Sequence, residues 1–241
     1  MARPIGIELR GGALNYGGTP VFEELDLDIP VGRTTCLLGP SGVGKSSLLR
    51  LIAGISPEAE AQRLVASDGA PIAGRLAFMD QRDLLLPWLN VFDNVTLGAR
   101  LRGETVDRHR AGLLLQRVGL ADQAEMLPAA LSGGMRQRAA LARTLMEDRP
   151  VILMDEPFSA LDALTRLRLQ DLAAQLLAGR SALLVTHDPM EALRLGHRIL
   201  VLSGDPARMG DPLEPLGEPP RPADDPILHG LAARILHDLA G

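Results

Sequence analysis

Apolar positions along the chain predict short strands that cluster towards its two ends. Residues 24–29, ELDLDI, alternate polar and apolar side chains, which is typical of a half-buried strand. Short continuous apolar runs predict strands that are covered on both faces. Such runs occupy residues 34–38, 75–79, 151–154, 182–186 and 199–202.

Helical periodicity fills most of the chain between these strands. The segments with this spacing are 46–52, 91–101, 107–118, 133–146 and 162–177. Because residues 85–149 are almost purely helical, the pattern predicts an α/β core that carries an inserted all-α subdomain. We expect one domain over residues 1–241, with its core at about 1–84 and 150–205 and the helical subdomain at about 85–149.

The C-terminal segment, about residues 206–241, is expected to be a tail on this domain. Residues 204–226 are rich in Pro, Asp and Glu, which predicts an extended linker. Residues 227–239 then predict a short helix that docks back on the core. A helix of this length is too small to form a regulatory domain of its own.

Composition narrows the class of protein. The chain is 46% hydrophobic but only 2% aromatic, so its core is mainly aliphatic. The net charge of −5 and the lack of a long basic block argue against nucleic acid as the main partner. No apolar run approaches the length of a signal peptide or a membrane span, so we expect a cytoplasmic protein. The single Cys36 cannot form an internal disulfide and is expected to fill space in a buried strand.

A glycine-rich loop follows the predicted strand at 34–38. Residues 39–46, GPSGVGKS, fit the phosphate-loop pattern and stand between a strand and a helix. Backbone N–H groups of such a loop point at phosphate oxygens, and the helix N-terminus adds partial positive charge. Lys45 is the only lysine among 25 basic residues, and an arginine fork is too broad for this position. The candidate nucleotide-binding residues here are Gly39, Pro40, Ser41, Gly42, Val43, Gly44, Lys45, Ser46 and Ser47.

Two carboxylates end the predicted strand at 151–154. Asp155 is expected to bind Mg²⁺ together with Ser46, and Glu156 to polarise the water that attacks the γ-phosphate. A strand that ends in Asp-Glu is a weak signal alone, because acidic residues often cap elements. About 110 residues after a phosphate loop, the same pair indicates phosphoryl chemistry.

A second anion site is predicted at LSGG, residues 131–134. Ser132 is suited to cap a helix that begins at Gly133, and capping is the simpler interpretation. However, Gly133 and Gly134 leave the N–H groups of the helix N-terminus unobstructed. Two anion sites in one phosphate-loop protein suggest that two copies share a nucleotide.

With these motifs the chain resembles the ATP-binding subunit of ATP-binding-cassette (ABC) transporters over about residues 5–225. The resemblance implies a P-loop NTPase (RecA-like) α/β core with an antiparallel β part and an inserted all-α subdomain. It further implies an ATPase that uses ATP and Mg²⁺. In that family the LSGG segment of one copy closes over the γ-phosphate held by the other, so a head-to-tail dimer with a second copy is expected.

The resemblance assigns roles to four more residues. Tyr16 matches the aromatic that stacks on adenine, and Asp162 in SALD matches the acidic residue of the loop that faces the other copy. Gln81 matches the glutamine that senses Mg²⁺ and the attacking water, and His187 matches the histidine that contacts the γ-phosphate. Taken alone, Tyr16 could pack on the surface, and His187 could simply precede a helix that starts at Asp188-Pro189.

Residues 81–95, QRDLLLPWLNVFDNV, resemble the branch of importer ATPases that serve nitrate, sulfonates, taurine and pyrimidine precursors. The resemblance implies integral-membrane permease subunits as partners, indirectly a substrate-binding protein, and a place on the inner face of the bacterial cell membrane. The apolar residues after Gln81 could form a groove for a permease helix. The alternative is that Trp88 belongs to the core of the helical subdomain.

The sequence departs from the family pattern at two places. Met135 stands where the family commonly has Gln, so altered kinetics are expected. The stretch from Lys45 to Gln81 is short, which leaves residues 55–74 weakly assigned.

Three alternative functions stay open. They are a soluble ABC ATPase that acts on ribosomes or DNA, a cassette that binds ATP without hydrolysis, and an importer of polyamine, metal or thiamine. Glu156 and His187 argue against the second.

Overall fold

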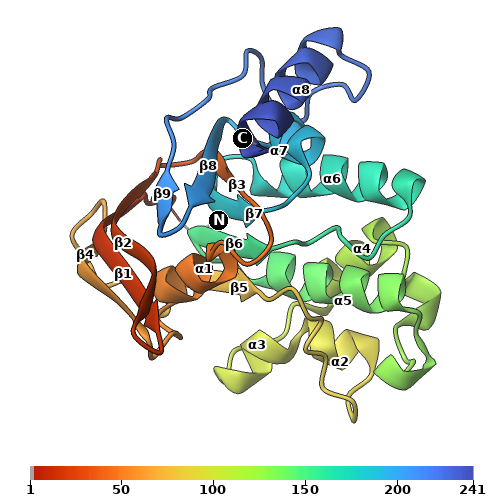
Figure 1. The fold of residues 1–241 in the computed structure, drawn as a ribbon. Helices are drawn as coiled ribbons and strands as arrows, with labels where there is room; N and C mark the ends of the chain where they lie inside the picture. The colour runs from red at the N-terminus through yellow and green to blue at the C-terminus, as the bar shows by residue number, and fades with distance from the viewer. Residues whose placement is uncertain (1–2, 241) are drawn as a thin grey trace.

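The computed structural model describes residues 3–240, and a nine-stranded sheet runs through this part of the chain. Its strand order is β4-β1-β2-β9-β8-β3-β7-β6-β5. The antiparallel strands β1, β2 and β4 curve away beside α1, while the helices α5 and α6 lie next to the other end of the sheet (Figure 1). The predicted α/β fold with an antiparallel part is therefore confirmed.

The parallel strands are mostly buried, which explains their apolar sequences. They are β3 (Thr34–Leu38), β5 (Leu76–Met79), β6 (Val151–Asp155), β7 (Ser181–Val185) and β8 (Arg198–Gly204). Every residue of β3, β6 and β7 is buried. Each predicted apolar run is confirmed as a strand, with bounds that differ by at most two residues.

The antiparallel strands were harder to predict. They are β1 (Ile7–Tyr16), β2 (Thr19–Ile29), β4 (Ala59–Ala66) and β9 (Ala207–Met209). Only the alternating segment within β2 was expected as a strand. Strand β4 resolves the weak assignment of residues 55–74, and β9 shows that a fully extended linker over 204–226 was wrong there. Strand β4 lies at an edge of the sheet and is only partly buried, and β9 has only three residues. Pairing with β1 or β8 therefore defines these strands rather than apolar pattern.

The helices follow the predicted segments closely. They are α1 (Lys45–Ala53), α2 (Val91–Val95), α3 (Leu97–Leu101), α4 (Arg108–Arg117), α5 (Gly133–Met146), α6 (Ala163–Leu177), α7 (Pro189–Leu195) and α8 (Pro226–Ala240). The expected helix over 91–101 is broken at Thr96, whose hydroxyl bonds the Phe92 carbonyl 3.0 Å away. Within residues 3–240, no helix combines the length and apolarity that crossing a bilayer requires.

Two hydrophobic clusters hold these layers together. One packs α1 between the antiparallel strands and one face of the parallel strands, with Leu48, Leu49 and Ile52 fully buried. The other joins α2 and α4–α8 to the opposite face and contains Cys36. Burial raises the pKa of the Cys36 thiol. Cys36 therefore fills space in a buried strand, as expected.

The C-terminal tail is fastened to α7 by one buried arginine. Arg221 is 4% exposed, and its guanidinium donates five hydrogen bonds to backbone carbonyls. Two of these carbonyls, on Leu193 and Gly196, lie at the C-terminal end of α7, both 2.7 Å away. Helix α8 then packs on α7. The tail thus satisfies orphan carbonyls at the end of a short helix.

Replacing this arginine tests whether the tail stabilises the core. Arg221→Ala should lower the free energy of unfolding by about 2–5 kcal/mol, because several buried carbonyls lose their donor. Urea denaturation measures the change. Arg234→Ala, at an exposed position on α8, is the matched control and should change stability little. Equal midpoints for the two variants would contradict this role of Arg221.

Candidate functional site

The site is assembled by the carboxyl ends of neighbouring parallel strands. In the sheet, Leu37 of β3 and Asp155 of β6 both pair with Val185 of β7, and Met79 of β5 pairs with Met154. The strands therefore end at the same edge, where ligands bind in open α/β sheets. The segments that follow them carry the Gly39–Ser47 loop, Gln81, Glu156 and His187.

The glycines of the phosphate loop are required by space and by backbone conformation. A Cβ atom on Gly39 would overlap the carbonyl oxygen of Leu202. Gly44 has φ +105°, and a Cβ atom there would come within 2.9 Å of Val21 Cγ1. Gly44 also accepts the first helical hydrogen bond from Leu48 N at 2.9 Å. The backbone of the loop therefore packs closely against Leu202 and Val21, which only glycine allows, and it continues directly into α1.

Lys45 lies inside this loop rather than on the surface. It is 6% exposed, and its Nζ donates to the carbonyls of Gly39 at 2.7 Å and Pro40 at 2.8 Å. Burial lowers the pKa of Lys45, and the charges of Glu156 and Asp155 oppose that shift. The loop thus surrounds a compact ammonium group with its own carbonyls. A planar guanidinium cannot occupy the same space, which explains why this position is not arginine.

Asp155 is a buried carboxylate that lacks a hydrogen-bond partner within the described residues. It is 1% exposed, and both of its side-chain oxygens are unpaired there. Burial raises the pKa of Asp155, the nearby Ser46 hydroxyl opposes the shift, and the charge of Glu156 adds to it. An unpaired buried carboxylate is unfavourable by itself. A hard cation held between Asp155 and Ser46 would satisfy these oxygens.

Glu156 is the centre of a polar cluster at the strand ends. Its backbone has φ +46°, uncommon for a residue other than glycine, and its N–H donates to Val185 O at 2.9 Å. One carboxylate oxygen accepts a hydrogen bond from Gln81 Nε2 at 3.3 Å, and the other lies 3.2 Å from His187 Nδ1. The structure therefore brings together the three residues that the sequence proposed as catalytic.

Two further residues hold the backbone of Glu156. Gln137 of α5 is 5% exposed, and its Nε2 donates to the Glu156 carbonyl at 3.1 Å. Ser159 Oγ donates to the same carbonyl at 3.1 Å. Neither residue was proposed from the sequence. The sequence did contain a sign of the role of Gln137. A side-chain amide on the apolar face of a helix needs a hydrogen-bond partner inside the protein.

The LSGG and SALD residues form helix starts that face outward. Ser132 caps α5 by accepting from Met135 N at 3.2 Å, and Asp162 caps α6 by accepting from Thr165 N at 3.0 Å. A Cβ atom on Gly133 would meet nothing closer than 3.9 Å, and one on Gly134 would meet the Ala160 carbonyl at 3.3 Å. No hydrogen bond or ion pair within residues 3–240 joins Ser132 to the phosphate loop.

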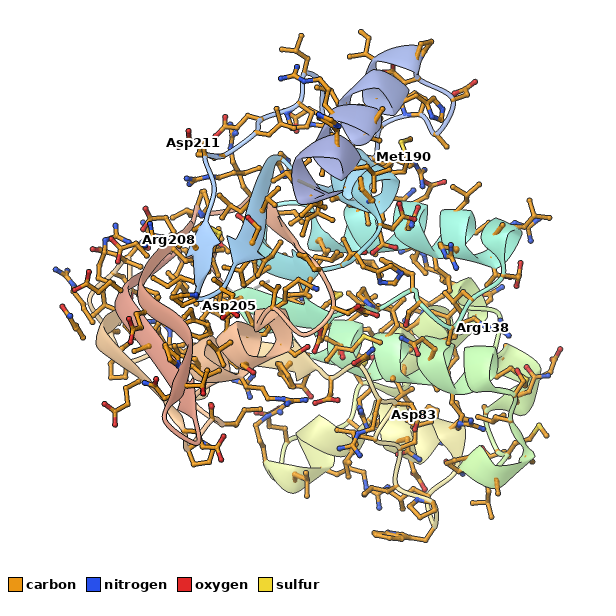
Figure 2. The ribbon with its side chains drawn as sticks, viewed as in Figure 1. Asp83, Arg138, Met190, Asp205, Arg208 and Asp211 are labelled. Atoms are coloured by element: carbon orange, nitrogen blue, oxygen red, sulfur yellow. The ribbon has the colours of Figure 1, made fainter. Side chains whose placement is uncertain are left out.

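The loop after Gln81 is tied to α5, the helix that begins with LSGG. Arg136 Nε lies 3.0 Å from Asp83 Oδ2, and Arg143 donates to the carbonyls of Asp83 and Leu84 at 2.7 and 2.8 Å. Asp83 lies in the segment beside α5 (Figure 2). Met135, which stands where the family commonly has glutamine, packs its side chain against the hydrophobic core. The Gln81 segment and α5 should therefore move together.

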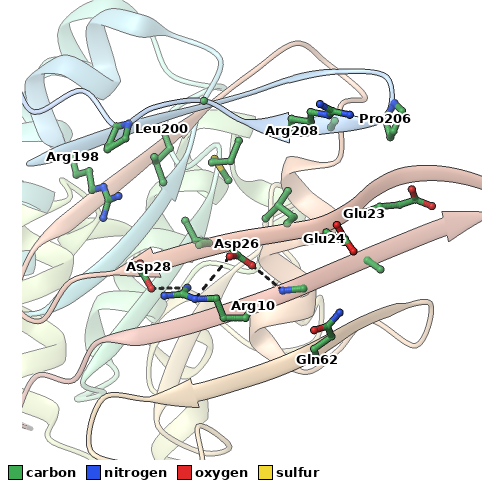
Figure 3. Close-up of a pocket in the computed structure, with 18 residues that line it drawn as sticks. Arg10, Glu23, Glu24, Asp26, Asp28, Gln62, Arg198, Leu200, Pro206 and Arg208 are labelled. Carbon is green, nitrogen blue, oxygen red and sulfur yellow. Dashed lines mark hydrogen bonds and ion pairs between the residues drawn. The ribbon is translucent and has the colours of Figure 1, made fainter.

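A large cavity of about 980 Å³ lies elsewhere, between β1–β2 and β8–β9 (Figure 3). It opens because β2 and β9 pair at one position only, Phe22 with Ala207, and then diverge. Arg10 lies beside it and contacts Asp28 at 2.8 Å and Asp26 at 3.9 Å. These ion pairs lie along the part of β2 that pairs with β1 but not with β9. None of the described residues that line the cavity belongs to the Gly39–Ser47 loop or to the cluster around Glu156, so its size does not mark it as the nucleotide site.

The predicted adenine contact stays a prediction. Tyr16 is the last residue of β1 and pairs through its backbone with Thr19. Its side chain lies outside the part of the chain that the structure describes.

The burial of Asp155 makes a prediction about stability. Asp155→Asn should raise the free energy of unfolding of the nucleotide-free protein at neutral pH by about 1–3 kcal/mol, because it removes an unpaired buried charge. With its pKa raised in the fold, wild-type Asp155 destabilises the protein progressively as pH rises above about 4, so the two proteins should converge below that pH. Thermal unfolding across pH measures this.

The exposed Asp122→Asn is the control for this experiment, and it should shift the midpoint little. A variant at Asp155 that is less stable than wild type at pH 7 would show that the carboxylate has a stabilising partner after all.

Comparison with known proteins places this geometry in a family. The profile of the family described as "ABC transporter" matches residues 22–159. An "Aliphatic sulfonates import ATP-binding protein SsuB" of Delftia acidovorans is 45% identical over 236 residues, 97% of this chain and 93% of that protein. A protein of the same description, SsuB 1 of Rhodococcus jostii (strain RHA1), is 48% identical over 202 residues, 83% of this chain and 80% of that protein.

Solved structures agree with the sequence comparison. A "Dimeric structure of a post-hydrolysis state of the ATP-binding cassette" bound to ADP and Pi superposes with a TM-score of 0.75 at 27% identity, covering 88% of this chain and 99% of that one. This chain has the fold of such a cassette. On that fold it carries the phosphate loop, the carboxylates at the end of β6 and the LSGG segment at the start of α5. The chain belongs to the ATP-binding proteins of the ABC transporter family and is an ATPase of that family.

Proposed function

We propose that this protein hydrolyses Mg²⁺-ATP between two head-to-tail copies and thereby powers import of a small organic anion, of the aliphatic sulfonate type, through a separate membrane permease. The observation that carries the proposal is the position of Glu156 between Gln81 and His187, at the same strand edge as the Lys45 loop. The sulfonate assignment is supported by the names of the relatives.

Binding of the triphosphate is assigned to the Gly39–Ser47 loop. Lys45 Nζ now donates to two carbonyls of its own loop, and phosphate oxygens would replace or join these acceptors. The N-terminus of α1 adds its partial positive charge at the same point. Tyr16 is proposed to stack on the adenine.

A Mg²⁺ ion fits the pair Asp155 and Ser46, with Gln81 as a further ligand. The fit is supported by the two unpaired carboxylate oxygens of Asp155, since Mg²⁺ commonly uses one or two carboxylates and completes its shell with water and phosphate oxygens. When bound there, the ion would neutralise charge that develops on the transferred phosphoryl group.

Glu156 is proposed to orient the attacking water and to accept its proton. Its carboxylate is contacted from one side by Gln81 and from the other by His187, and the His187 side chain is more exposed than that of Glu156. His187 can therefore turn from Glu156 towards a γ-phosphate. Gln137 and Ser159 keep the Glu156 backbone in place. In this cluster Gln137 and Ser159 position the backbone, and Glu156 alone acts on the water molecule.

A second copy is needed to complete this site. Ser132, Gly133 and Gly134 present an open helix N-terminus, which suits an anion. They are proposed to close over the phosphates bound by the other copy, with Asp162 facing the same interface. The dimeric cassette structures among the comparisons support such a pair.

Docking on a permease is proposed for the surface around Trp88. Trp88 is 71% exposed, so the alternative that it belongs to the core of the helical part is wrong. Leu101 is 78% exposed and borders a cavity of about 230 Å³ between β5, α3 and α5, lined also by Phe78 and Leu97. Exposed apolar side chains such as Trp88, and a cavity such as the one that Leu101 lines, suit an amphipathic helix. The protein would then lie on the inner face of the cell membrane, with a substrate-binding protein acting beyond the permease.

Removing the proposed base tests the chemistry. Glu156→Gln should reduce ATP turnover by at least about a hundredfold, as expected for loss of a general base, while leaving the phosphate loop able to bind ATP. Light scattering should then show an accumulated ATP-bound dimer. The exposed Glu125→Gln is the control and should keep normal turnover. Rapid turnover by Glu156→Gln would overturn the assignment.

Charging the apolar surface tests the permease partner. Trp88→Glu should reduce retention at the membrane when the protein is coexpressed with a sulfonate permease, because a carboxylate opposes burial of this surface. ATP binding in solution should be unchanged. Leu216→Glu, at a side chain that is 90% exposed in the tail, is the control and should stay at the membrane. Full retention of Trp88→Glu would exclude this surface, and a wild-type protein that never leaves solution would favour a soluble ABC ATPase.

A further inference from the structure

A second cavity, of about 390 Å³, lies away from the nucleotide site. It is formed by α4, the C-terminal end of α5, the end of α6 and the residue before β7. Four leucines line it. Leu114 and Leu145 are buried, Leu176 is partly buried, and Leu113 is 47% exposed. The leucines provide a mainly apolar lining with one side chain that reaches solvent.

The remaining side chains of the cavity carry an excess of positive charge. They are three arginines and one aspartate, namely Arg110, Arg117, Arg180 and Asp148. Burial lowers the pKa of Arg180, Asp148 opposes the shift, and the charge of the neighbouring Arg110 adds to it. Arg110 and Arg180 line the same cavity, where their like charges repel.

Each arginine is already oriented by the protein. Arg110 donates to Leu145 O at 3.0 Å, and Arg117 donates to Gln175 Oε1 at 2.6 Å. Arg180 is 6% exposed and donates to Glu147 O at 3.0 Å and to Asp148 Oδ1 at 3.2 Å. A guanidinium has five N–H donors, so these bonds leave further donors for a ligand.

The carboxylate of the neighbouring Glu147 does not balance this charge. Glu147 lines a different cavity, and its carboxylate lies 2.7 Å from the guanidinium of Arg102 and 3.7 Å from that of Arg149. Asp148, which pairs with Arg180, is the one carboxylate among the described residues that line the leucine-lined cavity. A ligand that enters must offer apolar surface to the leucines and negative charge to the guanidinium groups.

We propose that this cavity binds an aliphatic anion, an alkyl chain that ends in a carboxylate or sulfonate group. Its volume lies within the range of about 300–1,000 Å³ that is typical of small-molecule sites. Oriented guanidinium groups bind such oxyanions with paired N–H donors. The ligand would contact α4 and α5 on one side and α6 on the other. The inference is independent of the catalytic roles proposed above.

Direct binding to the full-length protein tests the proposal by calorimetry. The probes are 1-octanesulfonate and octanoate, with 1-octanol and octyltrimethylammonium as controls of equal chain length. At least one anion should bind at least about tenfold more tightly than both controls. Preference for the sulfonate would indicate a cargo-like ligand, and preference for the carboxylate would indicate a lipid-derived one. Binding that is equal for octanol, or absent for both anions, would overturn the proposal.

Substitutions at the mouth of the cavity locate the binding. Leu113→Glu should weaken anion affinity by about tenfold or more, whereas Leu113→Gln, of nearly equal size, should not. Arg117→Gln should also weaken it, and Arg108→Gln, on the same helix but not lining the cavity, is the matched control. All three positions are solvent-exposed, and thermal unfolding tests whether the four variants fold. Equal affinities for Leu113→Glu and Leu113→Gln would place the ligand elsewhere.

Discussion

The common register of the parallel strands is the constraint on which the site depends. Strands β3, β5, β6 and β7 end at one edge of the sheet, and each is followed within two residues by a residue of the site. A shift of any one strand would remove its residue from the cluster around Glu156. The fully buried apolar sequences of β3, β6 and β7 oppose such shifts. The hydrophobic core thus positions the chemistry.

The same edge concentrates groups that burial disfavours. Lys45 is enclosed by its loop, Asp155 has unpaired oxygens within the described chain, and Glu156 has a positive φ. Each of these features is unfavourable in the free protein and suits a bound triphosphate with its cation. A site of this kind lowers the stability of the free protein and favours nucleotide binding. Bound nucleotide should therefore raise the free energy of unfolding again. Arg221 and the α8 tail stabilise the opposite end of α7.

Local sequence predicted the buried strands, most helices and the motif residues, because these depend on apolar pattern and on close spacing. It did not predict β1, β4 or β9, which pairing defines, or the break at Thr96. It also left open whether Trp88 is buried, and it missed Gln137, whose bond to the Glu156 carbonyl spans 19 positions. Contacts of this kind depend on packing between distant segments, which a single sequence does not contain.

The central claim is that a triphosphate held by the Lys45 loop of one copy is closed by the Ser132 corner of another. A crystal structure with a non-hydrolysable ATP analogue and Mg²⁺ measures this most directly. The account predicts that Ser132 and Gly134 of one copy lie within hydrogen-bond distance of the γ-phosphate that the other copy binds. An assembled pair in which that corner faces away from every phosphate would contradict it.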